Sequence, residues 1–307
     1  MRAGFAILSL PVCLAACVGS VPPTVAPPLP PTATDARAPS DETRAGRAYY
    51  ARVEANYLGQ DRMREDGGGP DTPFTSRDLV ENFLAIAFFD EFAERDGALV
   101  AGGGEDRLHR WQGPVRVGVV FGASVPQDQQ EADRAAIADY VRRLARLSGL
   151  PMWLNDRNPN HTVFILNPEE RRAAAPLIRA VAPQTSAAAL GSVTGMRPDI
   201  YCTAFTFNPG GRDVIDRAVT VIRGELTAKL RMLCIHEELA QSLGLINDSP
   251  RARPSIFNDN EEFALLTRQD ELMLKILYDS RLRPGMTLAE ARPVVEVIAA
   301  ELMGGAG

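Results

Sequence analysis

Length, composition and charge exclude several classes of protein at the outset. The chain has 307 residues, is 45% hydrophobic and carries a net charge of −6. This length and apolar content suffice for one sizeable core, whereas the acidic balance argues against nucleic-acid binding through a basic surface. No stretch of the mature chain is long and apolar enough to cross a membrane as a helix.

The beginning of the chain indicates export and membrane attachment. A short apolar run ends in Leu-Ala-Ala-Cys at Cys17. This order resembles a bacterial lipoprotein signal, in which residues 1–16 are removed and Cys17 is lipidated; an ordinary secretory signal is the alternative. Because Val18, not Asp, follows the cysteine, the resemblance implies a lipid anchor in the outer membrane, facing the periplasm. Residues 17–40 are rich in proline, which predicts an extended tether.

Two cysteines remain after the signal and the lipid site are set aside. Cys202 and Cys234 form an even pair in an oxidising compartment, which favours a disulfide over two free thiols. Their Cα atoms are then expected to lie roughly 4.4–6.8 Å apart. Such a bond closes a loop of about thirty residues and stabilises the fold by ~3–4 kcal/mol.

Residues 41–105 are predicted to form a helical N-terminal segment. The apolar spacing indicates one helix from residue 41 to about 63 and a second, rich in phenylalanine, over residues 77–93. Residues 97–106 are glycine-rich and are expected to form a loop.

Strand and helix patterns then alternate over residues 106–282, which predicts a mixed α+β domain. The expected strands are β-branched runs at 113–122, 161–166, 199–211 and 217–224. The expected helices cover 129–150, 170–183, 225–245 and 267–279. A C-terminal helical tail, 283–307, begins with Thr287 and Glu290 spaced as a capping box.

The predicted helix over residues 225–245 contains the candidate functional residues. At 100° per residue, Glu237, Gln241 and Gly244 fall within about 60° of one another. The helix is apolar on two sides, which indicates burial between layers. Burying a carboxylate costs several kcal/mol unless it is paired or bound, so the polar residues of this helix mark a candidate site.

The spacing of this helix resembles a zinc-peptidase motif. The metzincin branch of the zinc peptidases carries His-Glu-x-x-His-x-x-Gly-x-x-His, in which three histidines bind zinc and the glutamate is the general base. EELAQSLGLIND, residues 237–248, is similar in spacing. The resemblance places Glu237, Gln241 and Asn247 at the zinc-ligand positions and Glu238 at the general base.

The likeness continues beyond the helix. Residues 254–279 are similar to the matrixin-like stretch that follows the zinc helix, with Phe257 in place of the methionine that underlies the metal. Asp270 and Tyr278 fall where that family has them. The match covers about residues 107–282 and implies a zincin-like domain, with a mixed sheet and a long central helix, preceded by a small helical segment.

The whole chain also resembles a family of bacterial lipoproteins known as domain of unknown function 2927. CIHEELAQSLGLINDS, SIFND and DELMLKILYDSRLRPGM carry this resemblance. It implies that the Glu-Glu-x-x-Gln pattern is characteristic of the group, and it implies no particular activity.

Histidines do not supply the missing zinc ligands. His109, His161 and His236 are the three in the chain, and none has another at ligand spacing; Ala240 occupies the second-ligand position that His236 would need. Zinc prefers His nitrogen and Cys sulfur, so an oxygen-rich set suits calcium better. The acidic loop at 258–262 lacks the regular spacing of a calcium loop and is expected to be solvated.

Three interpretations of the helix follow. In the first, Glu237 and Gln241 are buried and accept hydrogen bonds from residues 245–258, a polar network that replaces a metal. In the second, zinc or calcium binds Glu237, Gln241 and Asn247. In the third, one carboxylate of the adjacent Glu237 and Glu238 has a raised pKa and works as an acid–base group on a glycan, with Glu238 as the candidate catalytic residue.

The first interpretation leads to an expected function. No cofactor is expected, and the domain is a binding or scaffold module of the cell envelope, with an envelope protein or peptidoglycan as partner besides the membrane. An atypical metallopeptidase or glycan hydrolase that uses Glu238 is the alternative.

Overall fold

A five-stranded mixed sheet organises the fold in this computed structural model, which describes residues 37–208 and 213–304. In spatial order the strands are β5 (Met152–Leu154), β4 (Val115–Phe121), β6 (His161–Leu166), β9 (Arg217–Arg223) and β7 (Cys202–Phe207). The first four run parallel, whereas β7 pairs antiparallel with β9 at one edge. Every residue of β6 is buried, as expected for a central strand covered on both faces.

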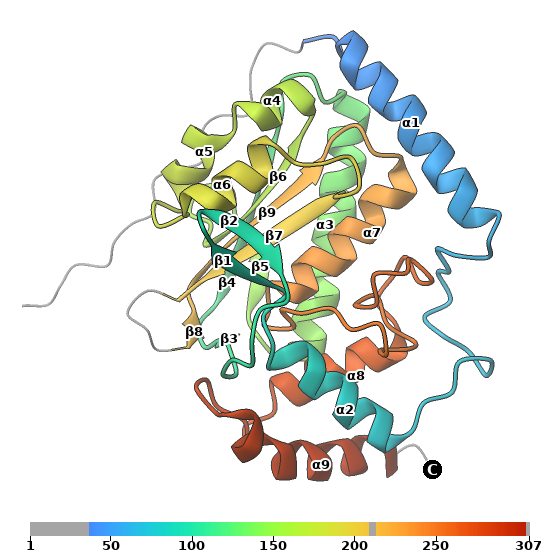
Figure 1. The fold of residues 1–307 in the computed structure, drawn as a ribbon, viewed down its shortest axis with the longest axis vertical. Helices are drawn as coiled ribbons and strands as arrows, with labels where there is room; N and C mark the ends of the chain where they lie inside the picture. The colour runs from blue at the N-terminus through green and yellow to red at the C-terminus, as the bar shows by residue number, and fades with distance from the viewer. Residues whose placement is uncertain (1–36, 209–212, 305–307) are drawn as a thin grey trace, which may run out of the picture.

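Helices cover both faces of this sheet (Figure 1). On one face, α3 (Gln127–Ser148) and α7 (Ala228–Gln241) pack over the main core, to which β6 contributes Val163 and Ile165. On the other, the short helices α4 (Pro168–Arg172), α5 (Ala175–Val181) and α6 (Ala187–Thr194) surround a smaller apolar cluster that includes Phe164 and Leu166. Alternate residues of a strand point to opposite faces, which is why β6 contributes to both clusters.

The two N-terminal helices end earlier than the sequence predicts. Helix α1 spans Asp41–Leu58 and α2 spans Ser76–Ala87, where ends near 63 and 93 were expected. The chain after α1 turns at Asp61 and Met63, whose φ angles of 56° and 58° are incompatible with a helix.

A β-hairpin follows α2 where the sequence analysis predicts the end of a helix and a loop. Strand β1 (Phe92–Arg95) pairs antiparallel with β2 (Ala98–Ala101). Asp96 and Gly97 form the connection with φ angles of 52° and 75°. An Asp-Gly pair with two positive φ angles is a favoured two-residue hairpin turn, so this part of the expectation is wrong.

The C-terminal helices close the main core. Helix α8 (Arg268–Leu277) and α9 (Leu288–Gly304) both pack against α2. The predicted capping box is present, because the backbone N–H of Glu290 donates to Thr287 Oγ1 at 3.3 Å and that of Thr287 donates to the Glu290 carboxylate at 2.9 Å. Buried side chains of α1, α2, α3, α7, α8 and α9 belong to one hydrophobic cluster, so the three predicted segments 41–105, 106–282 and 283–307 share a core.

The predicted mixed α+β class is confirmed. Three features have no predicted counterpart: the short edge strand β5, the helix α6, and the two-residue pair of β3 (Arg110–Trp111) with β8 (Val214–Ile215). Among the helices of the described residues, none combines the length and the apolar character that a membrane crossing requires.

Candidate functional site

Helix α7 forms one wall of an acidic pocket, and the edge strand β7 lies beside it. The Thr227 hydroxyl caps the helix by accepting from the Leu230 N–H at 3.3 Å. A disulfide between Cys202 of β7 and Cys234 of α7 ties the two elements together, with their Cα atoms 5.9 Å apart. The predicted disulfide is therefore confirmed, and it holds two walls of the pocket in a fixed relation.

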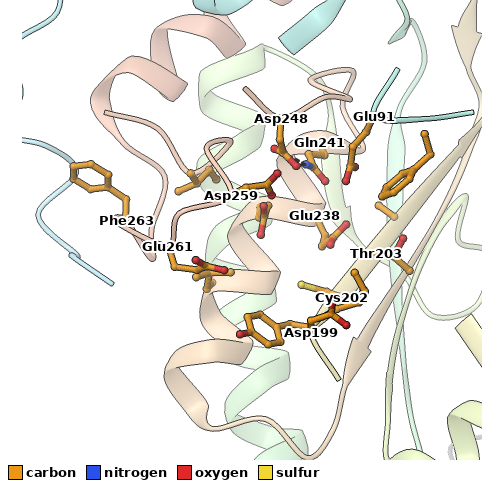
Figure 2. Close-up of a pocket in the computed structure, with 17 residues that line it drawn as sticks. Glu91, Asp199, Cys202, Thr203, Glu238, Gln241, Asp248, Asp259, Glu261 and Phe263 are labelled. Carbon is orange, nitrogen blue, oxygen red and sulfur yellow. Dashed lines mark hydrogen bonds between the residues drawn. The ribbon is translucent and has the colours of Figure 1, made fainter. Parts of the chain in front are cut away.

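The pocket itself is a cavity of about 140 Å³. Its walls come from α7, β7, the start of the β1–β2 hairpin and the segment 248–263 (Figure 2). Seven of its lining side chains are acidic: Glu91, Asp199, Glu237, Glu238, Asp248, Asp259 and Glu261. Among the described residues, the lining contains no lysine, arginine or histidine. The cavity is thus built for a ligand of positive charge or for bound protons.

Six of these groups, all except Asp199, lie without a basic partner; the five other than Glu261, which lies within the field of Arg62, are hereafter called the pocket carboxyls. They are Glu91, Glu237, Glu238, Asp248 and Asp259. None of them takes part in an ion pair within residues 37–208 and 213–304. Asp199, by contrast, pairs with Arg197. Like charges without counter-charge destabilise one another in a low-dielectric site.

Three of the pocket carboxyls come close enough to share one ion. One carboxylate oxygen from each of Glu237, Asp248 and Asp259 lies within 4.8 Å of the others. Gln241, one turn beyond Glu237 on α7, donates its side-chain amide to both Asp248 oxygens at 3.1 and 3.3 Å. The helix therefore provides one carboxylate and fixes the position of a second.

Glu238 completes the wall of the pocket from the neighbouring helix position. Its side chain is 5% exposed, and its Oε2 atom is buried without a hydrogen-bond partner in the part of the chain that the structure describes. Figure 2 shows Glu238 on α7, with its carboxylate directed toward the space that Glu91 also approaches. A buried polar atom without a partner is uncommon in native proteins and costs about 1–3 kcal/mol, so it calls for a ligand or a proton.

The electrostatics of the pocket follow from burial and from like charge. Burial raises the pKa of Glu91 to about 8, and the Asp259 carboxylate adds to this rise. Burial also raises the pKa of Glu237 and of Asp248 well above their ordinary values, with further contributions from neighbouring carboxylates. The same two causes raise the pKa of Glu238. At neutral pH the pocket consequently retains protons unless a cation replaces them.

The structure brings together three of the residues that the sequence analysis selected and separates a fourth. Glu237, Glu238 and Gln241 all line the pocket. Asn247 does not line it, because its side chain points toward helix α2, where its amide donates to the Ala85 carbonyl at 2.9 Å. The next residue, Asp248, faces the pocket in its place.

The hydrogen bonds expected to replace a metal are not those observed. Residues 245–258 were expected to donate to Glu237 and Gln241, but Asp248 accepts from Gln241. Within the described residues, the Glu237 carboxylate accepts no hydrogen bond from the protein. The carboxylates of Glu237, Asp248 and Asp259 therefore lie close together, and the Gln241 amide does not neutralise their charge.

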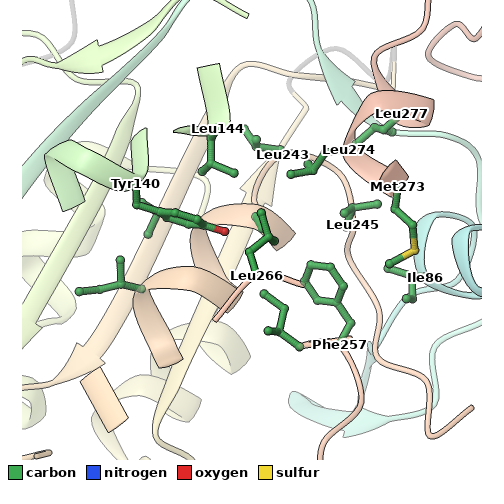
Figure 3. Close-up of a cluster of buried hydrophobic side chains, with 14 of the residues drawn as sticks. Ile86, Tyr140, Leu144, Leu243, Leu245, Phe257, Leu266, Met273, Leu274 and Leu277 are labelled. Atoms are coloured by element: carbon green, nitrogen blue, oxygen red, sulfur yellow. The ribbon is translucent and has the colours of Figure 1, made fainter. Parts of the chain in front are cut away.

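Phe257 lies in the apolar core and does not line the pocket. It is fully buried, in a cluster with Ile86, Leu245, Leu266 and Met273 (Figure 3). The turn on which it stands is fixed to helix α8 by Asp270, which accepts from the Ser255 hydroxyl at 2.6 Å and from the Ile256 N–H at 3.1 Å. Its role is to support the segment that carries Asp248 and Asp259.

The remaining predicted site is Cys17, which lies outside the described residues, as do the signal 1–16 and the first twenty residues of the tether.

Three pocket carboxyls were missed by sequence reasoning. Asp248 was one position from the residue that the zinc-motif spacing selected. Asp259 lies in the acidic loop expected to be solvated, yet one of its carboxylate oxygens lies within 4.8 Å of oxygens from Glu237 and Asp248. Glu91 lies just before the unpredicted hairpin, so no local signal placed it.

The residues present do not fit the zinc ion of a metzincin. His161 hydrogen-bonds Thr220 through Nε2 at 3.0 Å, and His236 accepts the Leu266 N–H at 3.0 Å through Nδ1. His109 contacts Asp106. With the pocket cysteine held in a disulfide, the donors are carboxylates and one amide, which zinc disfavours relative to nitrogen and sulfur.

No curated protein and no solved structure matches the chain. A family model matches residues 76–297, a span that runs from the start of α2 into α9 and contains every pocket residue. The chain therefore belongs to the family described as "Protein of unknown function (DUF2927)".

Proposed function

We propose that this protein is a membrane-anchored binding module of the cell envelope whose acidic pocket binds a positively charged group. One observation carries the proposal: five carboxyl groups converge on a cavity that has no basic side chain among its described lining residues. In the empty pocket, mutual repulsion and burial raise the free energy of the ionised carboxylates. A bound positive charge lowers that free energy. Relief of this repulsion therefore favours the binding of a positively charged group.

The scaffold of this module is a metzincin-like domain over residues 106–282. Its support is the motif spacing together with the geometry, since Glu237, Glu238 and Gln241 of helix α7 all line the pocket. The mixed sheet with an antiparallel edge strand next to this helix agrees with such a scaffold. Because oxygen donors stand where the zinc-binding histidines would be, the domain binds without catalytic zinc.

The anchor is the lipid on Cys17, which holds the domain at the outer membrane through the proline-rich tether. Several acyl chains on one cysteine anchor a protein stably, whereas a single chain would not. The proposed location gives the pocket access to envelope proteins and to peptidoglycan, whose peptides carry free amino groups. Mass spectrometry of the membrane fraction is expected to show a lipid-modified Cys17 at the N-terminus of the mature protein, and a soluble periplasmic protein that begins at another residue would contradict the anchor.

The binding proposal is tested by thermal unfolding of the full-length protein in detergent. The probes are calcium chloride and a muropeptide with a free amino group; sodium chloride at matched ionic strength and the same muropeptide with its amine acetylated are the controls. A ligand that binds only the folded protein raises Tm in proportion to its concentration. We expect at least one charged probe to raise Tm while its control does not. If neither probe does so, the proposal is wrong.

A hydrolase that uses Glu238 is the second candidate function. It rests on the buried, unpartnered Oε2 of Glu238 and on burial, which raises the pKa of this carboxyl and so suits it to proton donation. Purified protein would then cleave peptide or peptidoglycan, and Glu238→Gln would abolish cleavage without lowering Tm. A binding module instead gives no cleavage with either protein.

A further inference from the structure

We infer that the group bound in the pocket is a hard divalent cation of the calcium type, held by Glu237, Asp248 and Asp259. This inference rests on the proposed function and names the ligand of the same pocket. The three residues come from separate parts of the chain: the helix α7, the segment that follows it, and the acidic loop. A cation between them would join these three parts.

The distances between the oxygens fit such an ion. Three atoms that lie within 4.8 Å of one another are all within about 2.8 Å of a common centre, close to the roughly 2.3–2.6 Å of calcium–oxygen bonds. Magnesium and zinc would require a larger contraction, because their bonds to oxygen are roughly 2.0–2.2 Å. The cavity of about 140 Å³ also leaves room for the water ligands that fill a calcium coordination sphere.

Glu238 gives independent evidence for a ligand. Its Oε2 atom is buried, lacks a partner within the described residues and belongs to a side chain that lines the same cavity. A structural glutamate in a self-sufficient polar network would have donors on both oxygens. A cation held by the three neighbouring carboxylates would explain the unpartnered Oε2 of Glu238, because the cation would attract this atom directly or through a water molecule.

Charge favours a divalent cation over an amine. The three proposed ligands bring three negative charges, and Glu238 and Glu91 stand beside them. An ammonium group would neutralise one of these charges, whereas a divalent ion neutralises two. An all-oxygen carboxylate set is also the set that calcium prefers.

The acidic loop is held in place before any ion binds. The backbone N–H of Met63 donates to the Glu261 carbonyl at 2.7 Å, and that of Arg64 donates to the Glu262 carbonyl at 2.8 Å. These bonds fix the loop that presents Asp259, whose own backbone has a positive φ of 55°. A ligand set fixed in this way loses little conformational entropy on binding.

Calorimetric titration of the full-length, chelator-treated protein in detergent tests the inference. We expect one calcium ion per chain, and weaker binding of magnesium and zinc. Asp259→Asn keeps the shape of an exposed side chain while removing its charge, and should weaken calcium binding at least tenfold. Asp128→Asn, at the exposed start of α3, is the matched control and should leave the affinity unchanged. Glu238→Gln should weaken binding by a smaller factor if a water molecule links Glu238 to the ion.

Three outcomes would overturn the inference. Calcium that binds Asp259→Asn as tightly as the wild type would place the ion elsewhere. Zinc that binds more tightly than calcium would identify a different class of site. If calcium fails to bind but the amine-bearing muropeptide raises Tm, the pocket binds an amine, so the proposed function stands and this inference fails; if neither binds, both fail.

Discussion

Gln241 donates its side-chain amide to both carboxylate oxygens of Asp248, at 3.1 and 3.3 Å. The bond joins the last residue of α7 to the segment that leaves the helix, and it directs the Asp248 carboxylate toward Glu237. The helix position that carries a zinc ligand in the resembling peptidases thus orients a carboxylate in this chain. Gln241 is best understood as a positioning residue.

Replacing Gln241 is therefore expected to weaken cation binding without unfolding the helix. Gln241→Leu removes the donor that holds Asp248, and loss of such an orienting partner typically lowers metal affinity about 10- to 100-fold. Calorimetric titration with calcium measures the effect, and circular dichroism checks the fold. Gln127→Leu, at an exposed position, is the control. An unchanged affinity in Gln241→Leu would show that Asp248 needs no orienting partner.

Asp270 is predicted to contribute more stability than an exposed residue in the same structural role. Both Asp270 and Asp78 are the third residue of a capping box, in α8 and α2 respectively. Asp270 is fully buried and also accepts from Ser255 and Ile256, so Asp270→Ala should lower the unfolding free energy by ~3 kcal/mol. Asp78→Ala should cost about 1 kcal/mol. Chemical denaturation compares the two, and equal losses would contradict the tertiary role of Asp270.

The disulfide should stabilise the fold measurably. Cys202 and Cys234 are separated by 32 residues in the sequence, and a cross-link of this span stabilises by ~3–4 kcal/mol through its effect on the unfolded chain. We expect the Cys202→Ser/Cys234→Ser double variant to lose about this amount in urea denaturation. A reductant should shift the wild-type curve toward that of the variant and leave the variant unchanged. Coincident curves for oxidised wild type and variant would contradict the prediction.

His161 makes stability fall as the pH is lowered. Burial lowers the pKa of His161 to about 3, whereas an unfolded histidine titrates near 6.5. Below pH ~6.5 the unfolded chain therefore binds a proton that the folded chain does not, so stability present above this pH is lost on acidification, by ~2 kcal/mol between pH 6.5 and 5. His161→Gln should lose less over this interval. The pocket carboxyls titrate in both proteins, so the difference between their stability curves isolates His161; parallel curves would contradict the assignment.

Local pattern was sufficient to predict the elements that carry the site. Apolar periodicity located α7, and the β-branched runs located β4, β6, β7 and β9, because each of these signals lies within one segment of sequence. The pairing of Cys202 with Cys234 followed from compartment and cysteine count. The structure also explains the glycine in the motif, because Gly244 has a φ of 122° and a Cβ there would lie 2.1 Å from the His109 carbonyl oxygen.

The pocket could not be predicted fully because its composition depends on tertiary contacts. Motif spacing selected Asn247, but the hydrogen bond from its amide to Ala85 of α2 turns Asn247 away and brings Asp248 in. Glu91 reaches the pocket only because a hairpin, not a longer helix, follows α2. Asp259 depends on backbone bonds between its loop and residues 63–64. Each of these contacts joins segments far apart in the sequence, which periodicity and motif spacing do not report.

The most direct test of the acidic pocket as a cation site is anomalous diffraction from crystals grown with calcium. Long-wavelength data locate the ion independently of any assumed ligand set. The account predicts one strong anomalous peak within bonding distance of oxygens from Glu237, Asp248 and Asp259, with Glu238 oriented toward it. A pocket that contains only water at saturating calcium, or an ion bound elsewhere on the protein, would contradict it.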